Sequence, residues 1–187
     1  HQFDKAIEES RTALSHDPYN LTINMQLGKN LIYAGQYQLA VDQLQKTISF
    51  DSTNAIVHYN IGLAYIGLNQ LNKALYHFQK ATDLGEGNTR ILAALGFIKA
   101  ALGKKEEAKH IYDDLFQQAK NTYVPAYDLA TISLGLGYDD LAIRYLEEAY
   151  NNHEPWMPFI DMNPLFKTLK DNPQFQALVG KIGTSKK

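Results

Sequence analysis

The side chains that could do chemistry in this sequence are its six histidines and its neighbouring carboxylates. His110 and Asp114 stand four residues apart in "KHIYDD", so a helix would place both on one face, where they make at most half of a metal site. The histidines show no HxxxH or HExxH spacing. Adjacent acids such as Glu106 and Glu107 diverge on a helix and are typical of a solvated surface. We therefore expect no metal site.

Other catalytic signatures are absent from the sequence. It contains no cysteine, which excludes thiolate nucleophiles, disulfides and zinc–cysteine sites. No phosphate-binding loop, dinucleotide fingerprint or nucleophile elbow occurs. We therefore expect neither an enzyme nor a bound cofactor. The net charge of -2 and the pI of about 6.3 give no support to nucleic acid or an anionic membrane as the main partner.

The chain shows no targeting or membrane-spanning segment. Its most apolar run, residues 91–98, is far shorter than the about 20 residues that a spanning helix needs. No signal peptide is present. We expect a cytoplasmic location, with a periplasmic one left open. The sequence starts abruptly at "HQFDKAIEES", which predicts a segment cut from a longer protein.

A 34-residue repeat organises the helices that would carry these side chains. "LGKNLIYAGQYQLAVDQLQKT" (27–47) aligns with "IGLAYIGLNQLNKALYHFQKA" (61–81), then with residues 95–115 and 129–149. Corresponding positions share their chemistry across the four copies. One such position holds Gly28, Gly62, Gly96 and Ala130, and another holds Ala40, Ala74, Ala108 and Ala142. Such self-similarity indicates an array of identical structural units.

The period and these positions resemble the tetratricopeptide repeat, a helix-turn-helix of 34 residues. The resemblance implies an all-α, right-handed superhelical solenoid with four full repeats at 21–54, 55–88, 89–122 and 123–156. Residues 1–20 match only the second half of a repeat, so the first helix of that repeat is missing.

Glycines inside the first helices predict close packing. We expect Gly62 to lie where the second helix of its own repeat crosses, with Ala74 opposite and Phe78 facing the next repeat. The turn after that helix needs a left-handed residue, and we expect Asn69 to adopt it, like Gly35, Gly103 and Gly137.

After residue 156 the repeat ends, and residues 157–187 are expected to form a capping segment. Asn172 and Pro173 mark a helix start, and Phe175, Leu178, Val179 and Ile182 form one apolar stripe. Trp156, Leu165, Phe166 and Leu169 are expected to join this cap. The segment also resembles the closing part of repeat arrays in bacterial regulatory proteins. The alternative is an arm that docks on another subunit.

By the family pattern, one side of each first helix lines a concave, largely apolar groove that binds a peptide or a helix. Exposed apolar surface of this extent usually marks a binding site. Burial between adjacent first helices, or filling of the groove by a terminal segment, is the alternative. The expected groove residues are Met25, Lys29, Ile32, Tyr59, Asn60, Leu63, Ile66, Arg90, Phe97, Tyr127 and Leu134.

One subfamily grips the carboxylate end of chaperone tails with five residues, of which only Asn60 and Arg90 have counterparts here. We therefore reject that activity, although Asn60 and Arg90 remain candidates for bonding a ligand. The leading hypothesis is a non-catalytic protein-interaction scaffold. The alternatives are a regulatory or sensory module of a multidomain bacterial signalling or transcription protein, and a self-associating element that pairs through the truncated N-terminal face or the C-terminal tail.

Overall fold

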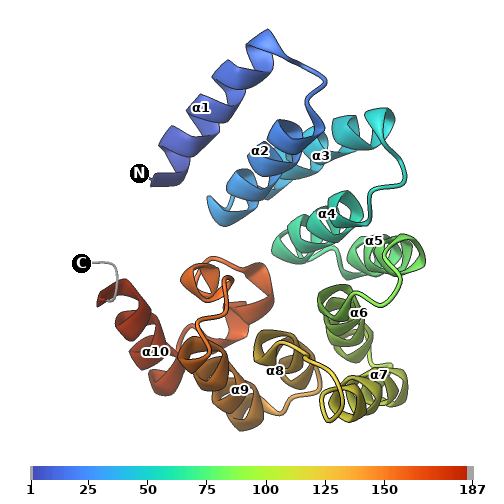
Figure 1. Cartoon of the computed structure of the whole chain (residues 1–187), viewed down its shortest axis with the longest axis vertical. Helices are drawn as coiled ribbons and strands as arrows, with labels where there is room; N and C mark the ends of the chain where they lie inside the picture. The colour runs from blue at the N-terminus through green and yellow to red at the C-terminus, as the bar shows by residue number, and fades with distance from the viewer. Residues whose placement is uncertain (1, 185–187) are drawn as a thin grey trace. The chain divides into compact units, whose positions relative to one another are not determined.

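The computed structural model describes residues 2–184, which form helices joined by turns and no strand, so the all-α expectation is confirmed (Figure 1). The chain divides into two compact units, residues 1–86 and 87–187. The helices are α1 (Gln2–His16), α2 (Leu21–Tyr33), α3 (Tyr37–Phe50), α4 (Ala55–Gly67), α5 (Leu71–Leu84), α6 (Thr89–Ala101), α7 (Lys105–Gln118), α8 (Ala126–Gly135), α9 (Asp139–Asn151) and α10 (Pro173–Thr184), with the 3-10 helices η1 (Met157–Phe159) and η2 (Pro164–Leu169).

The 34-residue period is visible in how the first helix of each pair begins. The side chains of Asn20, Asn54 and Asn88 accept hydrogen bonds from backbone N–H groups in the first turns of α2, α4 and α6. Such caps satisfy donors that a helix leaves unpaired at its start. α8 lacks this cap, because Pro125 stands at its N-terminus without a side-chain hydrogen bond. α8 is also shorter, with 10 residues against 13 in the other three.

The predicted turn residues adopt the left-handed conformation. Asn69 has a φ of 57°, and Gly35, Gly103 and Gly137 have φ values of 75°, 82° and 81°. Each lies between the two helices of one pair, where a left-handed residue ends the first helix. The expectation for Asn69 is therefore confirmed.

The close approach at Gly62 is confirmed, but its neighbour differs from the prediction. A methyl group added at Gly62 would lie 2.6 Å from Cε1 of Phe78, which is fully buried. Phe78 therefore packs against the first helix of its own pair. The large ring reaches Gly62 because the glycine leaves room for it.

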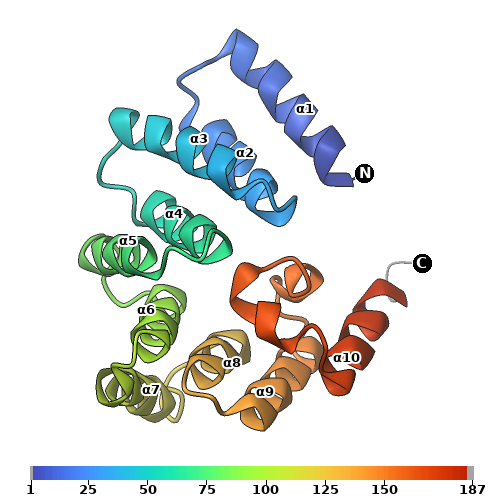
Figure 2. The ribbon, with the colours of Figure 1, turned by 180° about the vertical axis from the view of Figure 1, so that it is seen from behind.

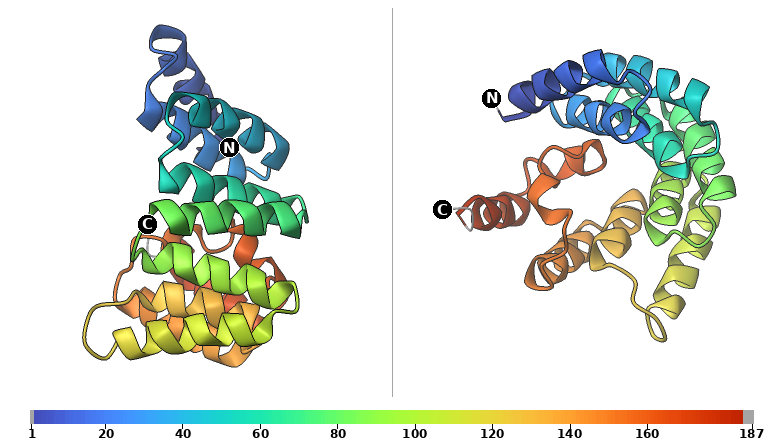
Figure 3. Two further views of the ribbon diagram at one scale, coloured as in Figure 1. Left: turned by 90° about the vertical axis from the view of Figure 1, so that its right-hand side faces the viewer. Right: turned by 45° about the horizontal axis from the view of Figure 1, so that its top comes forward.

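In unit 2 the C-terminal segment packs on α8 and α9 (Figure 3). Asn172 accepts hydrogen bonds from the backbone N–H groups of Gln174 and Phe175, and α10 begins at Pro173 as expected. Phe175 and Leu178 are buried, and Val179 and Ile182 are partly buried against the same core. The expected cap, including Trp156, Phe166 and Leu169, is confirmed.

Candidate binding surfaces

The predicted groove residues of unit 1 are divided between core and surface. The buried members are Ile32, Tyr59, Asn60 and Leu63. The half-buried members are Met25, Lys29 and Ile66. The expectation of a continuous exposed apolar channel is therefore wrong at the four buried residues.

The burial of α4 explains this difference. Residues 57–65 of α4 are all buried, because α2, α3 and α5 all contact this helix. The ring of Tyr59 lies with its centroid 5.8 Å from that of Phe78, in the helix pair's own core. A helix enclosed by three neighbours leaves little surface for a ligand, so apolar residues on it serve packing.

In unit 2 the predicted groove residues are covered by the chain's own C-terminal segment. Tyr127 and Leu134 are buried in a cluster that includes Met157, Ile160 and Phe166. Asn163 donates a hydrogen bond of 2.7 Å to the hydroxyl of Tyr127, and the Tyr127 and Phe166 rings meet edge to face at 5.3 Å. Phe97 is half-buried and packs on the same cluster. This part of the predicted surface is filled from within unit 2.

Arg90 is also engaged within unit 2. Its guanidinium carbon lies 3.6 Å from the ring centroid of Trp156, and its Nε lies 3.8 Å from Oδ1 of Asp128. Thr89 donates a 2.7 Å hydrogen bond to the other Asp128 oxygen. Burial raises the pKa of Asp128 to about 6, although Thr89 and Arg90 favour the charged carboxylate. The expectation that Arg90 bonds a ligand is replaced by an internal cation–π and ionic contact.

Glu154 is a buried residue that the sequence interpretation did not single out. Its carboxylate accepts hydrogen bonds from the backbone N–H groups of Ala126 (2.8 Å) and Tyr127 (3.1 Å). The acid thus caps α8, the helix that lacks the periodic asparagine, and its negative charge suits a helix N-terminus. The signal that could have revealed it is the break in the Asn20–Asn54–Asn88 series at residue 122.

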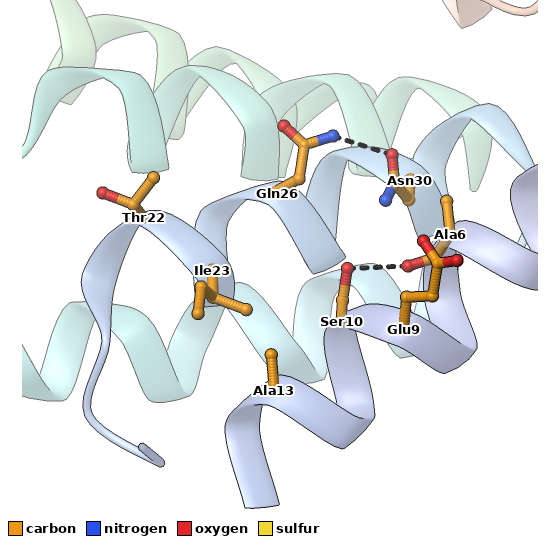
Figure 4. Close-up of a pocket in the computed structure, with 8 residues that line it drawn as sticks. All are labelled: Ala6, Glu9, Ser10, Ala13, Thr22, Ile23, Gln26 and Asn30. Atoms are coloured by element: carbon orange, nitrogen blue, oxygen red, sulfur yellow. Dashed lines mark hydrogen bonds between the residues drawn. The ribbon is translucent and has the colours of Figure 1, made fainter. Parts of the chain in front are cut away.

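In unit 1, α1 and α2 lie side by side (Figure 2), and residues of both helices line a groove of about 450 Å³ (Figure 4). We call it the α1–α2 groove. In Figure 4 the side chains of Ser10 and Glu9 on α1 lie opposite those of α2. Its lining residues are Ala6, Glu9, Ser10, Ala13, Thr22, Ile23, Gln26 and Asn30.

The His110 and Asp114 pair, considered above as half of a metal site, lies on neither of these surfaces. His110 and Asp114 make a 3.0 Å contact, and both side chains are exposed on α7. Within residues 2–184, no three His, Asp or Glu side chains gather as metal ligands would. None of the helices in this range has the length and apolarity to cross a membrane.

Two family models match the chain. One, described as a TPR repeat, covers residues 28–69, and the other, described as a tetratricopeptide repeat, covers residues 55–88. A comparison with curated proteins gave no significant match.

Several solved structures share the fold. A thermophilic TPR protein from Thermus thermophilus, TTC0263, is 17% identical over 98% of this chain and 90% of its own, with a TM-score of 0.65. MamA from Desulfovibrio magneticus RS-1 is 24% identical over 65% of this chain and 70% of its own, with a TM-score of 0.60. YrrB, described as a TPR protein with an unusual peptide-binding site, is 17% identical over 94% and 91%, with a TM-score of 0.56.

Identities this low show a shared fold only, and the family models match residues 28–88. The 34-residue period, the left-handed turn residues and the helix pairs agree with the two family models and with the shared fold. Residues 28–88 of the chain therefore match the tetratricopeptide repeat family, and the described residues share the fold of solved TPR proteins.

Proposed function

We propose that this chain is a non-catalytic interaction module that binds a peptide or a helix of a partner protein on the first helices of unit 1. The repeat family and its fold support a protein–protein interaction scaffold in general. The surface that we assign consists of Met25 and Lys29 on α2 and Ile66 on α4, and we call it the inner face of unit 1.

One observation supports this choice of surface. Met25 corresponds to Tyr127 by the 34-residue period, and Ile66 corresponds to Leu134. In unit 2 both counterparts are buried against the C-terminal segment, whereas Met25 and Ile66 are half-buried. The surface that a ligand needs is therefore already used in unit 2 and still accessible in unit 1.

The side chains of the inner face indicate the kind of ligand. Methionine adapts its shape to different apolar partners, and isoleucine adds fixed apolar area. Lys29 stands one turn after Met25 on α2, and the segment that we propose combines apolar and acidic residues. One similar structure, YrrB, is described as having an unusual peptide-binding site, and peptide binding by this chain is our proposal.

A selection of displayed peptides against the whole chain, followed by fluorescence anisotropy, tests the proposal. Met25→Glu combined with Ile66→Glu should weaken the selected peptides at least about tenfold, because each apolar contact contributes roughly 1 kcal/mol or more and tenfold is about 1.4 kcal/mol. Leu39→Glu, at an exposed position on α3, is the matched control and should leave binding unchanged. Equal binding by the double variant and the wild type would refute the proposed surface.

A further inference from the structure

One polar contact recurs at the same place in the helix pairs α2–α3 and α4–α5. Gln43 on α3 donates a hydrogen bond to Asn24 on α2. The 34-residue period places His77 on α5 and His58 on α4 at the same two positions, and their Nδ1 atoms lie 3.1 Å apart. Amides do not titrate, whereas imidazoles do. The link between α4 and α5 is therefore sensitive to pH, and the equivalent link between α2 and α3 is not.

The contact between the two imidazoles holds a single proton. A neutral imidazole has one N–H and one lone pair, so the contact needs an N–H on one Nδ1 and a lone pair on the other. A hydrogen bond with the backbone of Ser52 raises the pKa of His58, as a carbonyl that accepts from the imidazole does. Because Nδ1 of His58 faces His77, Nε2 of His58 is the atom that donates to Ser52. His77 then donates from Nδ1 to the lone pair of His58.

The surroundings of the pair disfavour positive charge. His58 is 8% exposed and His77 is half-buried. The rings of Tyr65 and Tyr76 pack on His77 at centroid distances of 5.5 Å and 5.1 Å. Burial lowers the pKa of both histidines, Lys80 on α5 lowers that of His58 further, and His58 has the same effect on His77. The remaining charged residues described between positions 21 and 84 shift neither pKa, so no carboxylate offsets a cation here; they are Lys29, Asp42, Lys46, Asp51, Lys73 and Asp83.

The pair lies next to the close approach of α4 and α5. His58 stands four residues before Gly62, and His77 is adjacent to Phe78, the ring that an added methyl group at Gly62 would meet. Two protonated imidazoles both carry an N–H at Nδ1, so they lose the hydrogen bond and repel each other across the contact. The two rings must then separate, and this movement acts on the helices where Phe78 packs.

We propose that His58 and His77 form a pH-sensitive link, in which the neutral pair holds α4 and α5 together and uptake of two protons opens this helix pair while α2 and α3 stay paired. The first proton leaves the N–H···N hydrogen bond in place, and the second removes it. The link is a property of unit 1 that requires no ligand, so it goes beyond the proposed interaction role. Its support is the contact between the two rings, their burial and the fixed amide link at the equivalent positions of α2 and α3.

Nitrogen NMR of the imidazole rings in the whole chain tests the hydrogen bond at neutral pH. Long-range spectra that correlate ring nitrogens with ring protons should show an unprotonated Nδ1 in His58 and a protonated Nδ1 in His77. An unprotonated Nδ1 in both rings would overturn the proposal, because neither ring could then donate to the other.

Hydrogen exchange of backbone amides counts the protons that opening takes up. Histidine in an open pair titrates near about 6.5, and the pKa of His77 in the closed pair is about 4, so opening grows as the pH falls between these values. From about pH 5.5 to about pH 4.5, the opening constant of α4 and α5 should rise by more than the about tenfold of one proton and approach the about hundredfold of two. His77→Gln leaves one titrating ring and should limit the rise to about tenfold.

The chain itself supplies the matched control. The double variant His58→Asn with His77→Gln copies the amide link of α2 and α3, and it should remove the pH dependence while α4 and α5 stay paired. A rise of about tenfold or less in the wild type, or an equal rise in the wild type and in His77→Gln, would overturn the proposal. So would an equal loss of amide protection in α2 and α3, because the whole of unit 1 would then be opening.

Discussion

The first helix of unit 1 and the last helix pair of unit 2 differ in what covers them. α8 and α9 carry large apolar residues such as Tyr127 and Leu134, and the C-terminal segment buries them under Phe166 and Phe175. The face of α1 that lines the α1–α2 groove carries Ala6, Ser10 and Ala13, together with the charged Glu9, and is half-open.

Side-chain size and polarity also distinguish the two faces. A large exposed apolar face lowers the solubility of the protein, and a covalently attached segment keeps such a face covered. A small face with a serine and a carboxylate is tolerated in water. The cover on unit 2 therefore stabilises that unit.

The largest effect is expected when the cover of unit 2 is damaged. Phe166→Ala removes a ring that is 1% exposed and should lower the free energy of unfolding by about 3–5 kcal/mol. Phe116→Ala, at a phenylalanine that is 40% exposed, is the control and should cost far less. Chemical denaturation measures both. Similar losses in the free energy of unfolding for the two variants would show that the C-terminal segment does not stabilise unit 2.

A second comparison sets a filled helix pair against the open face of α1. Gly62→Leu forces a side chain into Phe78 and should cost about 1–3 kcal/mol in the free energy of unfolding. Ser10→Leu enters the open groove and should change stability by less than about 0.5 kcal/mol. Gly180→Leu controls for helix propensity, because no atom lies within 4 Å of an added methyl group there. Equal losses at Gly62 and Ser10, measured by thermal unfolding, would show that the groove is closed.

The two kinds of helix cap give a third comparison. Glu154→Ala leaves two buried N–H groups of α8 without their acceptor and should cost about 1–3 kcal/mol. Asn54→Ala removes the cap of α4 and should cost about 1 kcal/mol, because this helix end is more accessible to water. Urea denaturation of both variants checks the order. A greater loss at Asn54 would contradict the role of Glu154.

The smallest effects concern pH, which is expected to change the stability of the two units in opposite directions. Burial, together with a smaller effect of the neighbouring His58, lowers the pKa of His77 to about 4. Unfolded histidine titrates near about 6.5, so the unfolded chain binds more protons between these values and unit 1 loses stability as the pH falls. Asp128 has its pKa raised to about 6, so its contribution to unit 2 grows as the pH falls from about 6 towards about 4.

Trp156, the single tryptophan, lies in unit 2, so its fluorescence follows that unit while circular dichroism follows both. The urea midpoints from the two signals should move apart as the pH falls from about 7.5 to about 4, the range that spans both titrations. His77→Gln should reduce this separation, and His16→Gln, at an exposed histidine of unit 1, should leave it unchanged. Identical pH profiles for both variants would contradict the assigned role of His77.

Much of the local structure could be predicted because it depends on short-range chemistry. The left-handed residue at Asn69, the helix start at Asn172 and Pro173, and the small residue at Gly62 each follow from what one position requires of its neighbours. The 34-residue period then indicates which helices pair. Even so, the sequence did not identify Phe78 as the side chain that lies nearest Gly62, because the period does not show which side of α5 faces α4.

The sequence by itself therefore determined the repeat, the turns and the capping segment, and only the tertiary structure decided which apolar residues remain accessible. Leu63 and Met25 have similar chemistry, yet one is enclosed by three helices and the other is half-open. Arg90 and Glu154 acquire their partners from residues 27 or more positions away. Burial and long-range pairing depend on how whole helices pack, and that packing is a property of many residues together.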